Sequence, residues 1–206
     1  MVYRATPKTE ARKADQRQRI ITAARELVAR HGFGGVQMTE LAQASGVATG
    51  TLYRYFPSKA SLYSEVFREG SQREVDALKV ELDKSGLAMA RLSAGLSRLI
   101  DRALHSRRLA WALIAEPVDP KVEADRLEYR REYARVLAAV IRDGIRENAW
   151  PAQDVERSAA AIVGALAEGI SGPLAPGEIE PGSPAATQFI LHLTTFCLRA
   201  LGAREG

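Results

Sequence analysis

The sequence predicts an all-α fold of about nine helices, in which an N-terminal three-helix unit with a helix-turn-helix precedes a larger C-terminal helical bundle. Apolar residues recur at the 3.6-residue spacing of helices, and no segment shows the alternation of a half-buried strand. Glycines and prolines separate these apolar stripes. With 206 residues, 46% of them hydrophobic, the chain can form one or two domains with a buried core, and disorder is not expected.

The N-terminal unit is predicted from one long apolar stripe and two short ones. The first stripe runs from Ile20 to Val28 and ends at His31-Gly32, a helix-stop signal. Two short helices follow over residues 38–45 and 49–56, with Gly46 in the turn between them. Ser58 is then expected to cap a long helix, because its hydroxyl can accept from a free backbone N–H of the first turn.

The next helices are separated by glycine and proline. Gly86 precedes a stripe from Leu92 to Leu104, and a shorter helix over residues 109–115 stops at Pro117. Asp119 and Pro120 form the N-cap and first position of a long helix that ends before Trp150.

The last third predicts a surface between two copies of the chain. Residues 152–170 are rich in Ala and Gly, residues 171–184 form a Pro- and Gly-rich loop, and residues 185–201 form a helix that is apolar on nearly every face. A surface helix needs only one apolar stripe, so the extra apolar faces require a partner. We therefore predict homodimerisation through residues 152–170 and 185–201; the alternative is that these helices form the centre of a monomeric bundle.

Several classes of protein do not fit the composition. No apolar run is long enough to span a membrane, and the N-terminus does not resemble a signal peptide. One cysteine and three scattered histidines provide neither a disulfide framework nor a zinc module. We expect a cytoplasmic protein with no metal and no cofactor. No metal-binding His-Glu-x-x-His, phosphate loop or di-iron Glu-x-x-His pair is present, so an enzyme working in a helical bundle is the least favoured class.

Charge is concentrated at the N-terminus. Residues 1–60 hold ten Lys or Arg and four Asp or Glu, a formal charge of +6, whereas the other 146 residues carry −2. This division is typical of a polyanion-binding head, although a solvated basic helix face would give the same numbers.

Residues 38–56 have the pattern of a DNA-binding helix-turn-helix. Ala42 is small where two helices cross, and Gly46 suits the left-handed backbone of a tight turn. Thr49 can cap the second helix. Three apolar residues are expected to hold the second helix against the first: Leu41, Val47 and Leu52.

The stretch from Gly46 to Lys59 (GVATGTLYRYFPSK) resembles the signature of the TetR family of bacterial transcriptional regulators. The stripe from Ile20 to Gly32 and the following Phe33-Gly34 are similar to the first helix and loop of that family. The resemblance covers residues 15–67. It implies an all-helical fold, a homodimer, and usually repression that is relieved by a small molecule.

The resemblance implies DNA contacts at six positions: Thr49, Gly50, Thr51, Tyr53, Tyr55 and Lys59. Thr hydroxyls and methyls suit phosphates and thymine, and a glycine permits close approach to the groove. Arg54 is expected to contact a base or a phosphate. Thr39 is a substitute phosphate contact, because Gln37 stands where the family usually has Thr. Tyr55 has core packing as an equal alternative.

The C-terminal bundle is predicted to enclose an apolar ligand cavity. Candidate lining residues are the apolar and aromatic side chains of the middle helices, with core packing as the alternative for each of them: Leu96, Ile100, Leu104, Trp111, Tyr129, Tyr133 and Leu137. Four arginines on one helix are either members of surface ion pairs or a clamp for the phosphates of an acyl-CoA: Arg126, Arg130, Arg131 and Arg135.

Together these features predict a ligand-responsive repressor that binds a palindromic operator as a homodimer and is released by a small hydrophobic effector, such as an acyl-CoA. The expected domains are a flexible basic arm (residues 1–14), a helix-turn-helix domain (15–60) and a ligand-binding and dimerisation domain (61–206). The alternative is an architectural DNA-binding protein without a small-molecule switch.

Overall fold

The computed structural model describes residues 7–174 and 178–203, and every regular element within these ranges is a helix. This confirms the predicted all-α class and the expected number of helices. In chain order the nine helices are α1 (Pro7–Gly35), α2 (Met38–Ala44), α3 (Thr49–Tyr55), α4 (Lys59–Leu82), α5 (Ala88–His105), α6 (Arg107–Ile114), α7 (Pro120–Arg146), α8 (Val155–Ser171) and α9 (Pro184–Ala200). None of them is long and apolar enough to cross a membrane.

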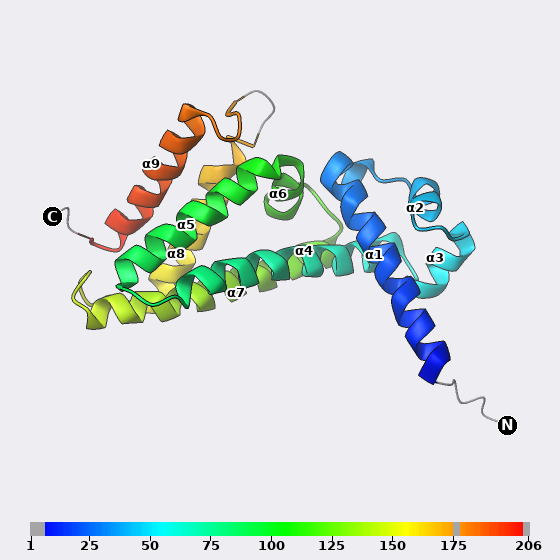
Figure 1. The fold of residues 1–206 in the computed structure, drawn as a ribbon, viewed down its shortest axis with the longest axis horizontal. Coiled ribbons are helices and arrows are strands. Elements are labelled where there is room, and N and C mark those ends of the chain that lie inside the picture. The colour runs from blue at the N-terminus through cyan, green and yellow to red at the C-terminus, as the bar shows by residue number, and fades with distance from the viewer. Residues whose placement is uncertain (1–6, 175–177, 204–206) are drawn as a thin grey trace.

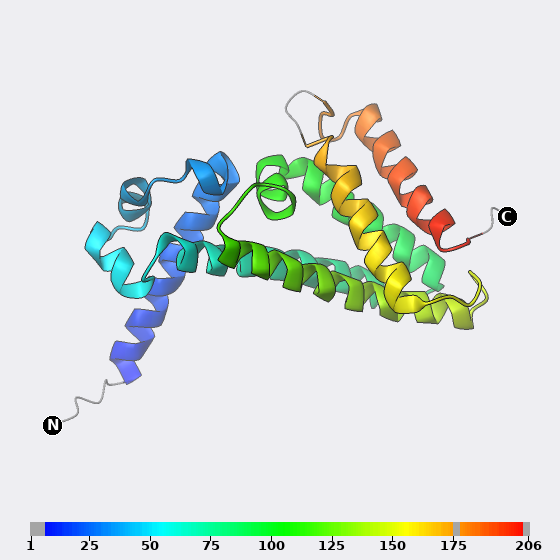
Figure 2. The ribbon, with the colours of Figure 1, turned by 180° about the vertical axis from the view of Figure 1, so that it is seen from behind.

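The helices form a small head, α1–α3, at one end of an elongated body, α4–α9 (Figure 1). In the body α4 and α7 lie side by side, and α5, α8 and α9 stack above them (Figures 1 and 2). We call the end of the body next to the head proximal and the opposite end, where α7 turns toward α8, distal.

Two hydrophobic cores follow this division, but they do not meet at the predicted domain boundary after residue 60. The core of the head continues along α4 as far as Phe67 and includes Ala112 and Val122 from α6 and α7. The core of the body begins on α4 at Leu78 and is built mainly from α5, α7 and α8. Helix α4 therefore belongs to both cores, and a displacement of α4 changes the position of the head.

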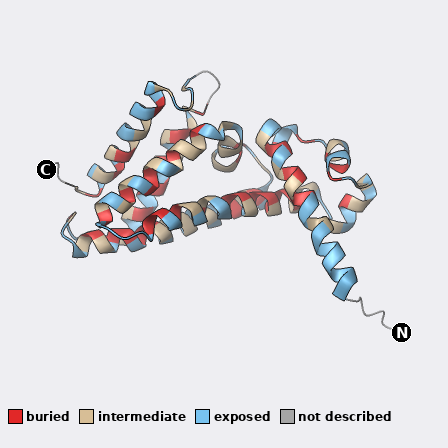
Figure 3. Cartoon of the chain, in the orientation of Figure 1, coloured by how far each residue is buried: buried red, intermediate tan, exposed pale blue. Residues whose placement is uncertain are grey.

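The predicted flexible arm is partly wrong. Residues 7–14 form the first two turns of α1 instead of an irregular segment, while residues 1–6 lie outside the described residues. The side chains of residues 7–15 are exposed, so these turns extend beyond the head into solvent (Figure 3). The run from Pro7 to Lys13 has a proline suited to a first turn, followed by Lys, Glu, Ala and Arg, which favour helix.

Side-chain caps begin two of the three helices at which the sequence predicts them. The Ser58 hydroxyl accepts from the Ser61 N–H at 3.0 Å, and the Ser61 hydroxyl accepts from the Ser58 N–H. Asp119 caps α7, which has Pro120 at its first position. The expected cap at Thr49 is wrong: Ala48 is the N-cap of α3, and no side chain caps that helix. Thr49 already has helical geometry, so its hydroxyl remains available to other groups.

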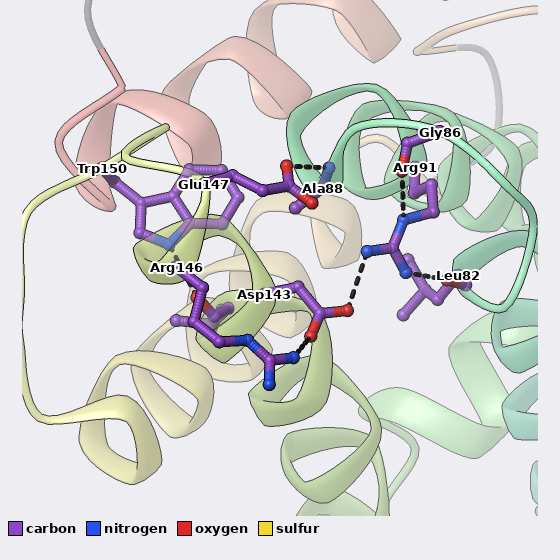
Figure 4. Close-up of polar contacts among 9 residues, drawn as sticks. Leu82, Gly86, Ala88, Arg91, Asp143, Arg146, Glu147 and Trp150 are labelled. Atoms are coloured by element: carbon purple, nitrogen blue, oxygen red, sulfur yellow. Dashed lines mark hydrogen bonds and ion pairs between the residues drawn. The ribbon is translucent and has the colours of Figure 1, made fainter.

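The distal end of the body is held by side chains that join α4, α5 and α7 (Figure 4). The Arg91 guanidinium donates to the carbonyls of Leu82 and Gly86 and to Asp143, at 2.7, 3.0 and 2.7 Å. The Glu147 carboxylate accepts from the Ala88 N–H at 2.7 Å. The hydrogen bond from Arg91 lowers the pKa of Asp143.

Tight packing of Trp150 against α7 completes this distal cluster. The indole N–H donates to the Ile141 carbonyl at 2.9 Å, and the ring covers Gly144 so closely that a Cβ there would lie 2.0 Å from it. Gly144 is therefore required for the approach of the ring, although its own backbone is helical.

Candidate DNA-binding head and ligand cavity

Helices α2 and α3 and the turn between them form the predicted helix-turn-helix. Gly46 has φ +67°, which confirms the left-handed turn that its lack of a side chain permits. Leu41 and Leu52 are completely buried, and Ala42 is 4% exposed where the two helices meet. Val47 is only partly buried at the edge of this packing. The head core thus fixes which face of α3 points outward.

The predicted DNA-contacting residues divide into an exposed and a half-buried set. Thr39, Gly50, Tyr53 and Arg54 are exposed, whereas Thr49, Thr51, Tyr55 and Lys59 are half-buried. Within the described ranges neither Tyr53 nor Arg54 has a hydrogen bond, ion pair or ring contact, so both side chains are available to a partner. Tyr55 packs against the head core, which supports its alternative role.

Lys59 already has partners inside the head. Its ammonium group donates to the Val36 carbonyl at 2.9 Å and lies 5.2 Å from the centre of the Tyr63 ring. The Tyr63 hydroxyl donates to the same carbonyl at 3.3 Å, and burial raises the pKa of this phenol. Lys59 therefore holds the segment before α2 against α4, and a phosphate would have to share this charge with Val36.

Helix α1 is broken at Gly32, and the break is bonded to the body. Gly32 has φ +72°, which confirms the predicted stop signal, although the chain resumes helical geometry as far as Gly35. The Glu116 carboxylate accepts from the N–H groups of Phe33 and Gly34, both at 2.9 Å, and is itself 5% exposed. Arg108 donates to the His31 carbonyl at 2.7 Å.

This junction was not predicted from the sequence. Glu116 lies more than 80 positions along the chain from the two amides that it binds, so no local spacing reveals the contact. The glycine stop signal indicates only that the helix is interrupted at Gly32, and not which side chain binds the backbone there. Arg108 lies in the first turn of α6 and Glu116 lies just after its end, so this helix connects the head to the body.

A cavity lies between α4, α5, α6, α7 and α8, with a volume of about 130 Å³. Its walls are mainly apolar, including Leu78, Leu99, Leu166 and Ile170.

Three of the seven predicted lining residues are on its wall, and all three come from α7: Tyr129, Tyr133 and Leu137. The other four predicted lining residues lie away from this cavity. Leu96, Ile100 and Leu104 are completely buried but point to a different side of α5, which instead presents Leu99 and Ala103 to the cavity. The sequence gives both stripes similar apolar character, so it cannot distinguish the core face from the cavity face. Trp111 is half-buried under the Arg108 guanidinium, whose central carbon lies 5.2 Å from the ring centre.

Polar side chains also stand among the apolar residues of the wall. Between α4 and α5, Arg102 donates to both carboxylate oxygens of Glu74, at 2.9 and 2.6 Å, which raises the pKa of the guanidinium. On α7, burial raises the pKa of Tyr133, so the phenol keeps its proton. Tyr129 donates to the Gln72 side chain at 3.3 Å, also with a raised pKa caused mainly by burial.

The four arginines of α7 have different environments. Arg126 is only 7% exposed and lines the cavity, so its ion pair is not a surface pair, and its role as a phosphate clamp stays a prediction. It donates to the carbonyls of Leu113 and Glu116 at 3.0 and 2.7 Å and pairs with Glu123. A cation at the end of α6 satisfies carbonyls that the helix leaves free, and burial lowers its pKa.

The remaining arginines stay near the surface. Arg135 pairs with Glu132, as the surface interpretation predicts, whereas Arg130 and Arg131 are exposed and have no partner among the described side chains. Arg130 also lies at the edge of the cavity. In the same ranges no three His, Cys, Asp or Glu residues gather as metal ligands.

Comparison with known proteins places this architecture in a family. Residues 20–66 match the profile described as "Bacterial regulatory proteins, tetR family". The chain is similar to the fatty acid metabolism regulator protein of Bacillus subtilis, with 24% identity over 65% of this chain and 70% of that protein. It is also similar to the transcriptional repressor KstR of Mycolicibacterium smegmatis, with 36% identity over 36% of this chain but only 34% of that protein.

A solved structure extends the likeness to nearly the whole fold. The regulator FadR of Bacillus subtilis, crystallised with stearoyl-CoA, superposes with a TM-score of 0.72 at 20% identity, covering 91% of this chain and 99% of FadR. These similarities show that residues 20–66 form a DNA-binding domain of the TetR family and that the chain as a whole shares the fold of FadR.

Proposed function

We propose that this protein is a cytoplasmic repressor that binds a palindromic operator as a homodimer. The exposed face of α3 carries this proposal, because Gly50, Tyr53 and Arg54 lie together on a helix that the head core holds in place. A recognition helix of this size enters a major groove, where an arginine can bind a guanine and a tyrosine can bind a phosphate. Two heads related by twofold symmetry would read the two half-sites.

The surface of α8 and α9 supports pairing with a second copy. On α9, Leu191 is 60% exposed and Phe196 is 57% exposed, and apolar groups of this size favour burial against a partner. On α8 the exposed positions include Ala160, Ala161 and Gly164, whose small side chains allow close approach of another helix. We therefore keep the predicted interface, residues 152–170 and 185–201, as part of the proposal.

We further propose that a small hydrophobic effector of the acyl-CoA class enters the cavity and releases the operator. The apolar wall suits the hydrocarbon part of such a molecule, and Arg130 at the cavity edge suits an anionic part. Crystallisation of a relative with stearoyl-CoA supports this class. A cavity of about 150 Å³ holds a benzene molecule; a longer chain enters the present volume only if the helices move apart.

Because the cavity must widen, the effector binds the widened state of the protein more tightly than the narrow state. Regulation by a ligand requires such a difference in affinity. Leu109 and Leu113 of α6 line the cavity, while Arg108 and Glu116 at its ends bind α1. Displacement of α6 by the effector would therefore move α1, and with it the separation of the two heads in the dimer.

Fluorescence anisotropy on DNA that flanks the gene for this protein tests the proposal. We expect saturable binding that resists scrambled competitor at 150 mM salt by a factor on the order of a thousand or more. A long-chain acyl-CoA is expected to reverse this binding. Binding of scrambled DNA with equal affinity, insensitive to acyl-CoA, would favour the architectural alternative and contradict the proposal.

A further inference from the structure

Tyr133 lines the cavity, and its hydroxyl has no hydrogen-bond partner among the described residues. Its neighbour on α7, Tyr129, lines the same cavity but donates to Gln72. The side chain is half-buried and its hydroxyl stays accessible, so it is free to donate a hydrogen bond to another molecule. The unsatisfied hydroxyl therefore indicates where a polar atom of a ligand would lie.

The charged groups near Tyr133 decide whether a neutral or an anionic ligand group is favoured beside its hydroxyl. Two ionised groups on the wall, Glu74 and Arg102, bind each other through two hydrogen bonds. The positive charge of the arginine is therefore already balanced. After burial, Glu74 is the largest influence on the pKa of Tyr133 and raises it, while Arg102 has the smallest influence and lowers it. An anion beside this hydroxyl would therefore gain no unpaired cation from this pair, whereas a neutral acceptor needs none.

We propose that Tyr133 is a specificity-determining residue that donates a hydrogen bond to a neutral carbonyl oxygen of the effector, so that the cavity favours a ketone, ester or thioester over a free carboxylate. A protonated phenol is a good donor, and the apolar wall around it removes competing water. This inference rests on the proposed role of the cavity as the effector site. Within that role it excludes a free fatty acid and favours an acyl thioester.

Three probes of nearly equal shape test the proposal on the full-length protein: acetophenone, benzoate and ethylbenzene. Each has only about two or three non-hydrogen atoms more than benzene, and they differ in carrying a neutral carbonyl, a carboxylate or neither. Dissociation constants are measured by NMR titration for the wild type, for Tyr133→Phe and for the control Tyr129→Phe. The control removes a hydroxyl from the same wall, but one that already has a partner.

We expect benzoate to bind the wild type most weakly. Tyr133→Phe should weaken acetophenone by about threefold to tenfold, the effect of one neutral hydrogen bond, and leave ethylbenzene unchanged. Tyr129→Phe should change neither ligand by this amount. The proposal is overturned if acetophenone binds Tyr133→Phe as tightly as wild type, if benzoate binds better than acetophenone, or if no probe binds the wild type.

A parallel titration separates this inference from the proposed function. Lauroyl-CoA and its thioether analogue S-dodecyl-CoA differ only in the thioester carbonyl, and both are added to the complex with operator DNA. If neither releases the operator while the acetophenone result holds, the acyl-CoA class is wrong and the role of Tyr133 stands. If lauroyl-CoA releases the operator equally well from wild type and Tyr133→Phe, the acyl-CoA class stands and the role of Tyr133 is wrong.

Discussion

The two ends of the body are held together in different ways. At the distal end, Arg91, Glu147 and Trp150 hold α4, α5 and α7 together through side chains that lie outside the cavity lining (Figure 4). At the proximal end, the short helix α6 forms part of the cavity wall and also binds the head through Arg108 and Glu116. A ligand that widens the cavity would therefore leave the distal end in place and displace the proximal end, which is connected to the DNA-binding helices.

The largest effect is expected from disrupting the distal end. Gly144→Ala places a methyl group 2.0 Å from the Trp150 ring, and neither α7 nor the ring can withdraw without losing packing. We expect a loss of about 3 kcal/mol in the free energy of unfolding, measured by denaturant titration. The matched control is Gly172→Ala, whose added methyl group meets no atom within 4 Å. Equal stability of the two variants would contradict the tight distal packing.

Removing one carboxylate from each end tests the comparison directly. Glu116→Ala removes the acceptor of two head amides, and Glu147→Ala removes the acceptor of the Ala88 amide at the distal end. We expect Glu116→Ala to reduce the release of operator by lauroyl-CoA about tenfold, a typical coupling between two sites. Glu147→Ala should keep the wild-type response. The ratio of operator affinities with and without lauroyl-CoA is the measurement, and an equal loss in both variants would remove any special role of α6.

A change on α3 should affect DNA binding without affecting either end of the body. Arg54→Ala removes an exposed guanidinium that has no partner in the described parts of the chain. We expect a loss of about 1–3 kcal/mol in the free energy of operator binding if Arg54 contacts a base. Competition with scrambled DNA identifies a phosphate contact instead, because the loss would then be similar for all sequences. Unchanged affinity for every DNA would show that Arg54 lies outside the interface. As a control, the affinity of the variant for the effector should stay at the wild-type value.

The smallest effect concerns the pH dependence of the distal end. Hydrogen bonds from arginines lower the pKa of Asp143 below its ordinary value of 3.8, so its ionised form stabilises the fold at neutral pH. This contribution is fully present above the ordinary pKa and is lost as the pH falls through the lower, folded-state pKa. Because the pair is partly exposed, we expect Asp143→Asn to cost at most about 1 kcal/mol at pH 7. Chemical denaturation at pH 7 and pH 3 should show this difference shrinking in acid; a constant difference would assign it to packing.

Local patterns predicted most of the helices and the head. The apolar stripe before Gly32, the turn glycine Gly46 and the caps at Ser58 and Asp119 all act within four or five residues, so the sequence displays them directly. The same applies to the outward face of α3, which follows from burying Leu52. The expectation for residues 7–14 failed because basic charge says nothing about order, whereas their helix-forming composition does.

The sequence by itself therefore determined that the protein is helical, where most of its helices lie, and that its N-terminal unit has a DNA-binding pattern. Only the tertiary structure decided which stripe of α5 lines the cavity, that Arg126 closes the end of α6, and that Glu116 binds the break in α1. The physical reason is the distance along the chain over which the interacting residues lie. A helix satisfies its backbone within one turn, but a cavity wall and a junction depend on which distant segments the packing of whole helices brings together.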